Sequence, residues 1–249
     1  MTQVIKITNL NFAYNKNPDL VLQDININIE KGSMVAIIGP SGVGKSTLFK
    51  LIVRAIKPKN GTIEIFNKDI NKLNKKDWKK TINKVGFLTQ KANLINTENV
   101  FENIKRTNTN YPNFIQKFFG ILTHKEKIKI FETLDELGIL NKAFYRVSEL
   151  SGGQQQRVEI AKLLIQNVDL ILADEPTSNL DNQTSREVLE LLKKLSQDGK
   201  TILVNIHDLS FIKSHFTHVI AIKNKRVFLA KNTKEINQWE LIQALKTLE

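Results

Sequence analysis

The chain has 249 residues, 41% of them hydrophobic, and a formal net charge of +12. It contains no cysteine, which excludes a disulfide framework and a thiolate metal site. No apolar run approaches the roughly 18 residues that a membrane-spanning helix needs, and residues 1–7 lack the pattern of a cleavable signal. We therefore expect an intracellular protein with one sizeable core, or a core and a small lobe. Any membrane role would depend on a partner.

The basic charge has two interpretations. It could mark an anionic partner, such as a membrane surface or nucleic acid, or it could reflect a composition rich in lysine throughout the chain. We favour the compositional interpretation, because the basic residues form no dense block. Residues 72–84 come nearest to one, and we expect them to be a solvent-exposed face.

The first ninety residues predict strands around one glycine-rich loop. Two segments with alternating apolar residues, joined by a turn-rich link over 15–19, are typical of antiparallel strands. Residues 34–38 form a continuous apolar run, as in a buried parallel strand, and the glycine loop follows them. In chain order, we predict strands over 4–14, 21–29, 34–38, 61–66 and 85–88, and a helix over 46–55.

The middle of the chain has a helical character. Residues 125–137 place apolar side chains at every third position, which predicts an amphipathic helix, and residues 108–113 form a polar break. We interpret this part as a helical lobe inserted into the core. Beyond it we predict helices over 154–165, 183–195 and 238–248, strands over 170–173 and 201–206, and a hairpin of 219–222 with 226–230.

This order of elements predicts an α/β fold. Strands that alternate with helices favour a mostly parallel sheet with crossover connections. We expect residues 1–249 to form a single domain, with an α/β core over 1–92 and 162–249 and the helical lobe over 93–161.

Residues 39–47 match the phosphate-loop pattern G-x-x-x-x-G-K-[ST], between a predicted strand and a predicted helix. The glycines let successive backbone N–H groups face a phosphate, and the helix start adds partial positive charge. We expect Lys45 to reach the β- and γ-phosphates of a nucleotide and the Ser46 hydroxyl to bind Mg²⁺. The residues expected to bind nucleotide here are Gly39, Pro40, Ser41, Gly42, Val43, Gly44, Lys45, Ser46 and Thr47. The motif alone does not distinguish a kinase, a GTPase or a transport ATPase.

Two adjacent carboxylates follow the apolar run 170–173. Such a pair at a strand end is costly unless a cation or a catalytic task compensates for it. We expect Asp174 to hold Mg²⁺ and Glu175 to orient or deprotonate the attacking water.

Residues 150–157, Leu-Ser-Gly-Gly-Gln-Gln-Gln-Arg, are the most specific motif of the chain. With them the chain resembles, over essentially its whole length, the ATP-binding subunits of ABC (ATP-binding cassette) transporters. The resemblance implies a P-loop NTPase (RecA-like) core with an antiparallel β subdomain and an inserted helical lobe. It also implies that Ser151, Gly152 and Gly153, with Gln154 beside them, contact the γ-phosphate of an ATP held by a second copy.

Four further positions fit the family pattern. The resemblance implies that Tyr14 stacks on adenine and that Gln90 contacts Mg²⁺ and water where the chain enters the lobe. It implies that Asp181 lies in a loop that joins the two active sites, and that His207 senses the γ-phosphate and assists hydrolysis.

The resemblance also implies a working cycle with partners. Two copies, head to tail, would enclose two ATP molecules, and hydrolysis would open the dimer. A membrane permease would dock a helix beside Gln90. Apolar residues nearby would line that groove or belong to the core of the lobe: Phe87, Leu94, Ile95, Val100 and Phe101.

Within the family, residues 143–149 and 201–207 resemble phosphonate-type importer subunits. We expect a peripheral ATPase at the cytoplasmic face of the membrane, energising high-affinity uptake of an organic or phosphorylated anion. Separate permease subunits and, indirectly, an extracytoplasmic solute-binding protein would be its partners, with no nucleic acid.

Three alternatives stay open. Residues 176–181 also fit the ATPase of a lipoprotein-release or cell-division ABC complex. A soluble ABC protein acting on nucleic acid or ribosomes is disfavoured, because the chain has neither a second cassette nor a long insertion. A regulatory ATP binder without turnover is disfavoured by the presence of both Glu175 and His207.

Overall fold

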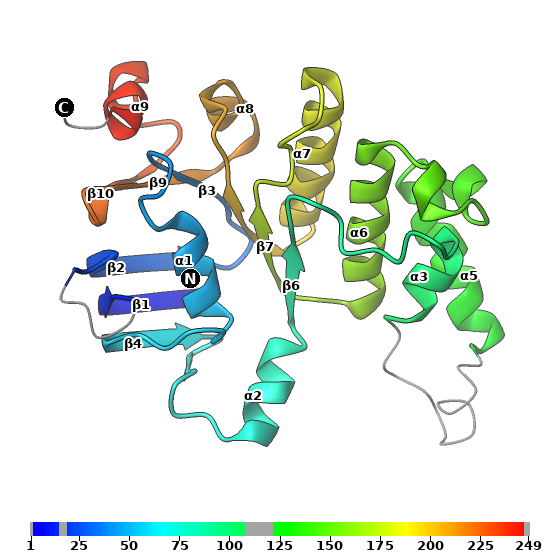
Figure 1. Cartoon of the computed structure of the whole chain (residues 1–249), viewed down its shortest axis with the longest axis horizontal. Helices are drawn as coiled ribbons and strands as arrows, with labels where there is room; N and C mark the ends of the chain where they lie inside the picture. Colours follow the sequence, from blue (N-terminus) through cyan, green and yellow to red (C-terminus); the bar gives the residue numbers. More distant parts are fainter. Residues whose placement is uncertain (1, 15–18, 108–121, 247–249) are drawn as a thin grey trace.

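The computed structural model describes residues 2–14, 19–107 and 122–246 (Figure 1). Its strands are β1 Gln3–Phe12, β2 Leu22–Glu30, β3 Met34–Ile38, β4 Asn60–Ile65, β5 Lys68–Asp69, β6 Val85–Leu88, β7 Leu170–Asp174, β8 Thr201–Asn205, β9 His218–Lys223 and β10 Arg226–Asn232. Its helices are α1 Lys45–Ile52, α2 Lys75–Ile82, α3 Val100–Lys105, α5 His124–Glu136, α6 Gly152–Gln166, α7 Asn182–Gln197, α8 Ile212–His215 and α9 Gln238–Leu245, with 3₁₀ turns at Leu140–Lys142, Val147–Glu149 and Leu209–Phe211.

A six-stranded sheet, in the order β10-β9-β3-β8-β7-β6, forms the centre of the molecule. Its strands run parallel except for β10, which pairs antiparallel with β9. All residues of β3 and β8 are buried, which explains the continuous apolar sequence of β3 and the apolar run 202–204 of β8. The predicted mostly parallel sheet, the predicted hairpin and the α/β fold class are therefore confirmed.

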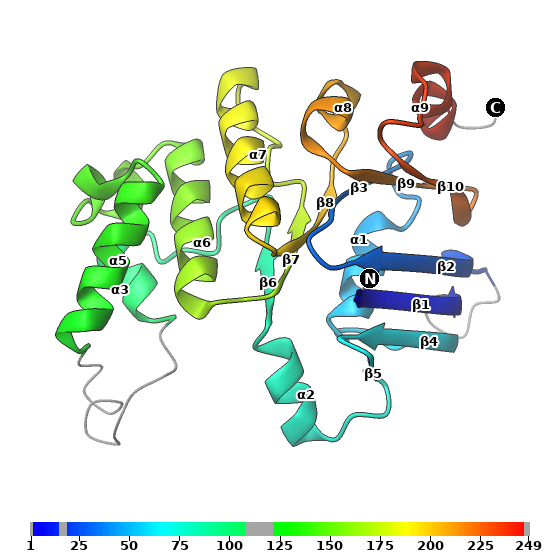
Figure 2. The ribbon, with the colours of Figure 1, turned by 180° about the vertical axis from the view of Figure 1, so that it is seen from behind.

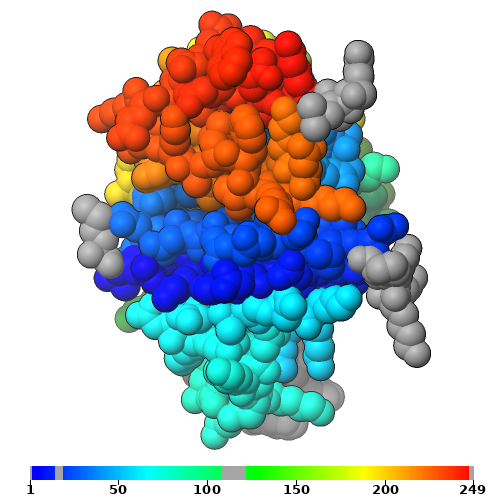
Figure 3. All heavy atoms as spheres, turned by 90° about the vertical axis from the view of Figure 1, so that its left-hand side faces the viewer, coloured from blue at the N-terminus to red at the C-terminus, as the bar shows by residue number. Residues whose placement is uncertain are grey.

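A second, antiparallel sheet has the order β2-β1-β4-β5. Alternate residues of the central strand β3 face opposite layers: Val35 and Ile37 pack with the antiparallel sheet and α1, whereas Ala36 and Ile38 pack on the side of α6 and α7. Figure 3 shows the end of the molecule where the N-terminal strands lie as a band between the C-terminal segment and residues near 60–80. The central sheet is thus covered on both faces, as a parallel sheet requires.

Helices α3, α5 and α6 lie together at the end of the molecule opposite the antiparallel sheet (Figures 1 and 2). Buried residues from all three helices, including Ile104, Ile130 and Val158, belong to one hydrophobic cluster. The rings of Phe101 and Phe131 stack at 5.3 Å between centroids. The helical character predicted for the middle of the chain is therefore confirmed for the described residues.

Some predicted boundaries are wrong. Helix α1 ends at Ile52 rather than at residue 55, because the chain turns at Arg54, which has a left-handed backbone (φ 56). Helix α2 lies within 72–84, where the sequence predicts only an exposed face. Its start is fixed by Asn74, whose side chain accepts a hydrogen bond from the backbone of Asp77 at 2.9 Å.

Three predicted segments extend beyond the residues that the structure describes. Most of the link at 15–19, the polar break at 108–113 and the end of the predicted helix 238–248 lie outside the described residues. No helix in the described part of the chain is long and apolar enough to span a bilayer. Of the apolar residues near the predicted groove, Val100 is fully buried in the hydrophobic cluster that contains Ile104 and Ile130, whereas Ile95 is 42% exposed.

Candidate active site

The predicted phosphate loop joins β3 to α1 at the carboxyl end of the central sheet, where ligands of such folds bind. Gly39 (φ 149) and Gly44 (φ 109) of this loop have backbone angles that favour glycine. A Cβ atom on Gly39 would lie 2.1 Å from the backbone oxygen of Ile222, and one on Gly44 would lie 2.8 Å from Leu22 Cδ2. Both positions therefore require glycine for conformation and for space.

Helix α1 begins without a side-chain cap. Its N-cap residue, Gly44, makes no capping hydrogen bond, and the first turn carries no acidic residue. The first N–H groups of a helix lack partners within the helix, and the helix dipole is positive there. The start of α1 consequently fits a phosphate group, which would accept hydrogen bonds from these donors.

Lys45 adds a cation to this loop. Its side chain is almost fully buried, and its Nζ donates to the backbone oxygens of Gly39 (2.8 Å) and Pro40 (3.1 Å). Burial lowers the pKa of Lys45, and the nearby carboxylates of Glu175 and Asp174 oppose this shift. The carboxylates favour the charged form of the lysine at the place where an anionic nucleotide would bind.

The carboxylate of Asp174 ends β7 and joins two neighbouring elements. Its Oδ1 accepts hydrogen bonds from Ser46 Oγ at 3.1 Å and from Asn205 Nδ2 at 2.6 Å. Within the described residues, the buried Oδ1 of Asn205 has no hydrogen-bond partner. Hydroxyl and carboxylate oxygens are the ligands that Mg²⁺ takes in proteins, so the donor set of Ser46 and Asp174 fits this ion.

Glu175 and His207 face one another across the ends of β7 and β8. Glu175 Oε1 lies 2.7 Å from His207 Nε2. The backbone of Glu175 is left-handed (φ 52), and its carbonyl accepts hydrogen bonds from the amide (3.1 Å) and the hydroxyl (2.8 Å) of Ser178. A strained backbone held by its surroundings is a feature that clusters at functional sites. The turn directs the Glu175 carboxylate toward the histidine and the phosphate loop.

Most of these groups line one cavity of about 180 Å³. Its walls come from the phosphate loop, the start of α1 and the ends of β7 and β8: Ser41, Gly42, Gly44, Lys45, Ser46, Thr47, Glu175, Asn205 and His207. The arrangement can hold a phosphate chain at one wall and a carboxylate–imidazole pair at another. A water molecule between them could therefore lose a proton as it attacks.

Of two other predicted residues, Tyr14 lies beside this cavity and Gln90 does not. The hydroxyl of Tyr14 is 3.1 Å from Thr47 Oγ1, and its ring, 44% exposed, meets Phe12 edge-on. Gln90 is exposed in the loop directly after β6 and does not line the cavity. The structure thus brings Tyr14 to the start of α1 and leaves Gln90 outside the cavity.

The signature residues form a separate site at the start of α6. Ser151 is the N-cap: its hydroxyl accepts from the Gln154 amide at 3.3 Å, and Gln154 Oε1 accepts from the Ser151 amide at 3.0 Å. A Cβ atom on Gly153 would lie 2.2 Å from Thr184 Cγ2 of α7, so glycine permits close helix packing here. None of residues 151–154 lines the cavity.

Asp181 caps the neighbouring helix α7. Its carboxylate accepts hydrogen bonds from the amide (2.9 Å) and the hydroxyl (2.6 Å) of Thr184. These bonds, the one from the hydroxyl foremost, lower the pKa of Asp181. Asp181 and Gly153 therefore contact the same threonine, which joins the start of α6 to the loop before α7.

Asn205 is a cavity residue to which the sequence analysis assigns no function. It lies on β8 directly opposite Asp174 of β7, and it is 1% exposed. A buried polar residue is unexpected at the end of an otherwise apolar strand. That signal is present in the sequence Thr-Ile-Leu-Val-Asn, and it could have identified the residue.

Comparisons with known proteins identify the family. Residues 22–178 match the model of the ABC transporter family. The protein of Mesomycoplasma hyorhinis named "Probable ABC transporter ATP-binding protein p29" is 41% identical over 97% of this chain and 96% of its own. The protein of Fusobacterium nucleatum named "Phosphonates import ATP-binding protein PhnC" is 34% identical over 99% of this chain and 100% of its own.

The fold also matches a solved structure, the dimeric ATP-binding cassette MJ0796 in a post-hydrolysis state with ADP and Pi. The TM-score is 0.74 and the sequences are 31% identical, over 93% of this chain and 100% of that one. The chain belongs to the ABC transporter family and is an ATP-binding, ATP-hydrolysing subunit of an ABC transporter.

Proposed function

We propose that this subunit energises import of a phosphonate-type or other organic or phosphorylated anion through separate permease subunits. The relative from Fusobacterium, whose whole length is matched, carries the name of a phosphonate import protein. The observation that carries the ATPase part of the proposal is the single cavity that joins the phosphate loop to the Glu175–His207 pair.

Within this cavity, the start of α1 and Lys45 would bind the β- and γ-phosphates, with Tyr14 beside the adenine. Ser46, Asp174 and Gln90 would hold Mg²⁺, which, when bound, would neutralise charge on the phosphates. Glu175 would accept the proton of the attacking water, and His207 would hold that carboxylate in place. The 2.7 Å contact between Glu175 and His207 supports this division of tasks.

The signature residues would act on the ATP of a second copy. Ser151 is exposed, and it begins a helix on a part of the chain that does not reach its own cavity. An exposed hydroxyl at a helix start is suited to bind an anion presented from outside. The solved relative MJ0796 is described as a dimer with ADP and Pi, which supports a head-to-tail dimer for this chain.

We further propose a division of the domain and a location. The core would consist of 1–92 and 162–249 and the lobe of 93–161, and the subunit would lie peripherally at the cytoplasmic face of the membrane. An extracytoplasmic solute-binding protein would deliver the anion to the permease.

The dimer can be tested with two inactive variants. Lys45→Ala should weaken nucleotide binding, because it removes the buried cation from the loop. Ser151→Arg should retain nucleotide binding and block closure of a dimer in which both subunits carry the arginine. A mixed dimer then contains one site with an intact loop from one subunit and an intact Ser151 from the other, so mixing should restore ATPase activity. A mixture that stays inactive and forms no ATP-dependent dimer would overturn the shared site.

The transport part needs a different experiment. The tagged protein should be purified from native membranes in mild detergent, and its partners should be identified by mass spectrometry. A polytopic permease with an extracytoplasmic binding protein would support import. A single permease with a large extracytoplasmic domain and no binding protein would favour the lipoprotein-release or cell-division alternative.

A further inference from the structure

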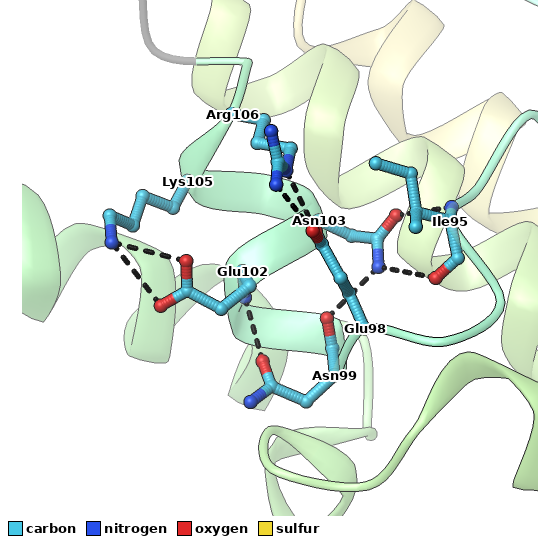
Figure 4. Close-up of polar contacts among 7 residues, drawn as sticks. All are labelled: Ile95, Glu98, Asn99, Glu102, Asn103, Lys105 and Arg106. Atoms are coloured by element: carbon cyan, nitrogen blue, oxygen red, sulfur yellow. Dashed lines mark hydrogen bonds and ion pairs between the residues drawn. The ribbon is translucent and has the colours of Figure 1, made fainter. Parts of the chain in front are cut away.

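Two asparagines in the described part of the chain are buried, Asn103 on α3 and Asn205 on β8. An asparagine amide has one oxygen that accepts hydrogen bonds and an NH₂ group that donates two. Asn103 uses its oxygen and both N–H groups within the chain (Figure 4). The oxygen accepts from the backbone N–H of Ile95 at 2.7 Å, and the nitrogen donates to the carbonyls of Ile95 (3.1 Å) and Asn99 (3.0 Å). The amide of Asn103 therefore serves the local fold.

Asn205 is as deeply buried but uses only part of its amide. Its Nδ2 donates to Asp174 Oδ1 at 2.6 Å, whereas its Oδ1 has no hydrogen-bond partner among the described residues. A buried polar atom without a partner lowers stability, and native structures contain few of them. Asn205 also lines the cavity that contains Lys45 and Glu175. A residue that is unfavourable for the fold and lies at the site calls for a functional explanation.

Asn205 contacts both acidic residues at the end of β7. Its side chain binds Asp174, which lies opposite it in the parallel pair of β7 and β8, and its carbonyl accepts from the Glu175 amide at 3.1 Å. Ser46 Oγ donates to the same Oδ1 atom of Asp174 at 3.1 Å. Two neutral donors, one from α1 and one from β8, therefore hold one carboxylate oxygen.

A neutral donor suits a carboxylate that is to bind a cation. A lysine or arginine in place of Asn205 would hold Asp174 with a positive charge, which would offset the negative charge of the carboxylate and repel Mg²⁺. An amide orients the carboxylate and leaves its full charge for the ion. The amide oxygen necessarily accompanies the NH₂ group, which accounts for the buried atom without a partner.

We propose that Asn205 is a positioning residue of the magnesium site, which holds the Asp174 carboxylate in place for Mg²⁺ through a neutral hydrogen bond. The proposal rests on the proposed function, in which Ser46 and Asp174 bind this ion. Groups that hydrogen-bond a metal ligand orient it, and their removal weakens metal binding. Asn205 thereby contributes to the metal site without being a ligand.

The first test measures how much Mg²⁺ strengthens nucleotide binding. The dissociation constant of the purified chain for AMP-PNP, a non-hydrolysable ATP analogue, is measured by calorimetry in EDTA and in Mg²⁺, and the ratio of the two values is the magnesium gain. Asn205→Leu keeps the branched shape of the side chain and removes both polar atoms. The magnesium gain should then fall about tenfold, with no change in EDTA, because the phosphate loop and Lys45 are intact. A gain equal to that of the wild type would overturn the inference.

The stability of the ligand-free chain separates this role from a structural one. Asn205→Leu removes the unpaired oxygen and leaves Asp174 its bond from Ser46, so the free energy of unfolding in urea should be unchanged or higher. Asn205→Val, which is smaller and suits a strand, repeats both measurements in case leucine disturbs the packing.

Thr201→Val is the matched control on the same strand. Thr201 is buried at the other end of β8, and its Oγ1 accepts from the Gly32 amide at 3.1 Å. Its replacement should lower the free energy of unfolding and leave the magnesium gain unchanged. A loss of the gain in Thr201→Val equal to that in Asn205→Leu would overturn the inference.

Two further results distinguish failure of the inference from failure of the proposed function. Asp174→Asn should abolish the magnesium gain; if the gain persists, the proposed magnesium site is wrong and the inference falls with it. If Asp174→Asn loses the gain but Asn205→Leu and Asn205→Val keep it, the inference alone fails.

The magnesium dependence of turnover separates metal binding from a direct role in hydrolysis. In Asn205→Leu, the free Mg²⁺ concentration that gives half of the maximal ATPase activity should rise about tenfold, while kcat at saturating Mg²⁺ stays near that of the wild type. A low kcat at saturating Mg²⁺ with an unchanged half-saturating concentration would assign Asn205 to the attacking water and overturn the inference.

Discussion

The helices α1 and α6 both begin where the proposed function places ATP phosphates, but their first amide groups are satisfied differently. At α1, Gly44 provides no side-chain cap. At α6, Ser151 and Gln154 close a reciprocal pair of hydrogen bonds around the helix start. The start of α1 therefore leaves its first amides for a ligand, whereas at α6 the amide of Gln154 is already bonded to the capping side chain of Ser151.

This difference fits the two proposed tasks. The glycine loop can surround a phosphate chain, because no side chain caps the start of α1 and the Lys45 cation lies beside it. The Ser151 hydroxyl accepts from the Gln154 amide, so its own proton remains available for an acceptor outside the chain. The start of α1 can hold ATP within the subunit, and the start of α6 can offer the Ser151 hydroxyl to an ATP across a dimer.

The largest effect on kcat is expected in the cavity at the start of α1. Glu175→Gln removes the proton acceptor and keeps both helix starts, so kcat should fall about 10³-fold while ATP still binds. The closed dimer should accumulate, and size-exclusion chromatography with ATP would detect it. Lys45→Ala is the contrasting variant, because it should lose nucleotide binding and therefore the dimer. ATPase activity of Glu175→Gln near that of the wild type would remove Glu175 from the proposed mechanism.

A smaller effect is expected where α6 meets α7. Gly153→Ala places a Cβ atom 2.2 Å from Thr184 Cγ2, and overpacking of this kind costs about 1–3 kcal/mol. Alanine would regain at most about 1 kcal/mol of helix propensity, so Gly153→Ala should lower the free energy of unfolding. Thr184→Ser removes the clashing methyl group and keeps the hydroxyl bonded to Asp181. In that background Gly153→Ala should be neutral or stabilising in urea denaturation, and persistent destabilisation would refute the steric explanation.

The features that the sequence predicted correctly are those that depend on local patterns. The motif at 39–47, the buried strand 34–38 and the alternation of strands with helices depend on local patterns, and the structure has all of them. Helix α2 was not predicted, because its eight residues are mostly charged or polar and have no apolar period. Its start depends on the single cap Asn74.

Contacts between distant residues were the hardest to predict. Asn205 meets Asp174 only because β8 lies beside β7, and Lys162 reaches Asn93 across 69 positions in the sequence. Local patterns give residue types, whereas such pairs depend on the tertiary fold. The sequence motifs nevertheless assign Lys45, Glu175 and His207 to functions that their positions allow, and those functions remain predictions.

The cap of α6 can be separated from its proposed contact across the dimer. Ser151→Ala should lower the free energy of unfolding by about 1 kcal/mol, the usual value of an N-cap. Thr123→Ala is a matched control, because Thr123 and Glu126 form the same reciprocal cap at the start of α5. Both variants should lose similar stability, but only Ser151→Ala should weaken ATP-dependent dimerisation. Equal dimerisation in the two variants would show that the hydroxyl of Ser151 serves only its own helix.

The smallest effect is expected at the start of α7, which the carboxylate of Asp181 caps. Hydrogen bonds from Thr184 lower the pKa of Asp181 in the folded chain. A carboxyl group with a depressed folded pKa contributes stability that is present above its unfolded pKa, near 3.9, and is lost as the pH falls through the folded value. Asp181→Asn keeps an acceptor for the Thr184 amide and cannot ionise. Its deficit in the free energy of unfolding should therefore be largest near neutral pH and should fade under acid conditions. Thr184→Ala, which removes the foremost cause of the shift, should flatten the same pH dependence, and a deficit that grows on acidification would contradict the assignment.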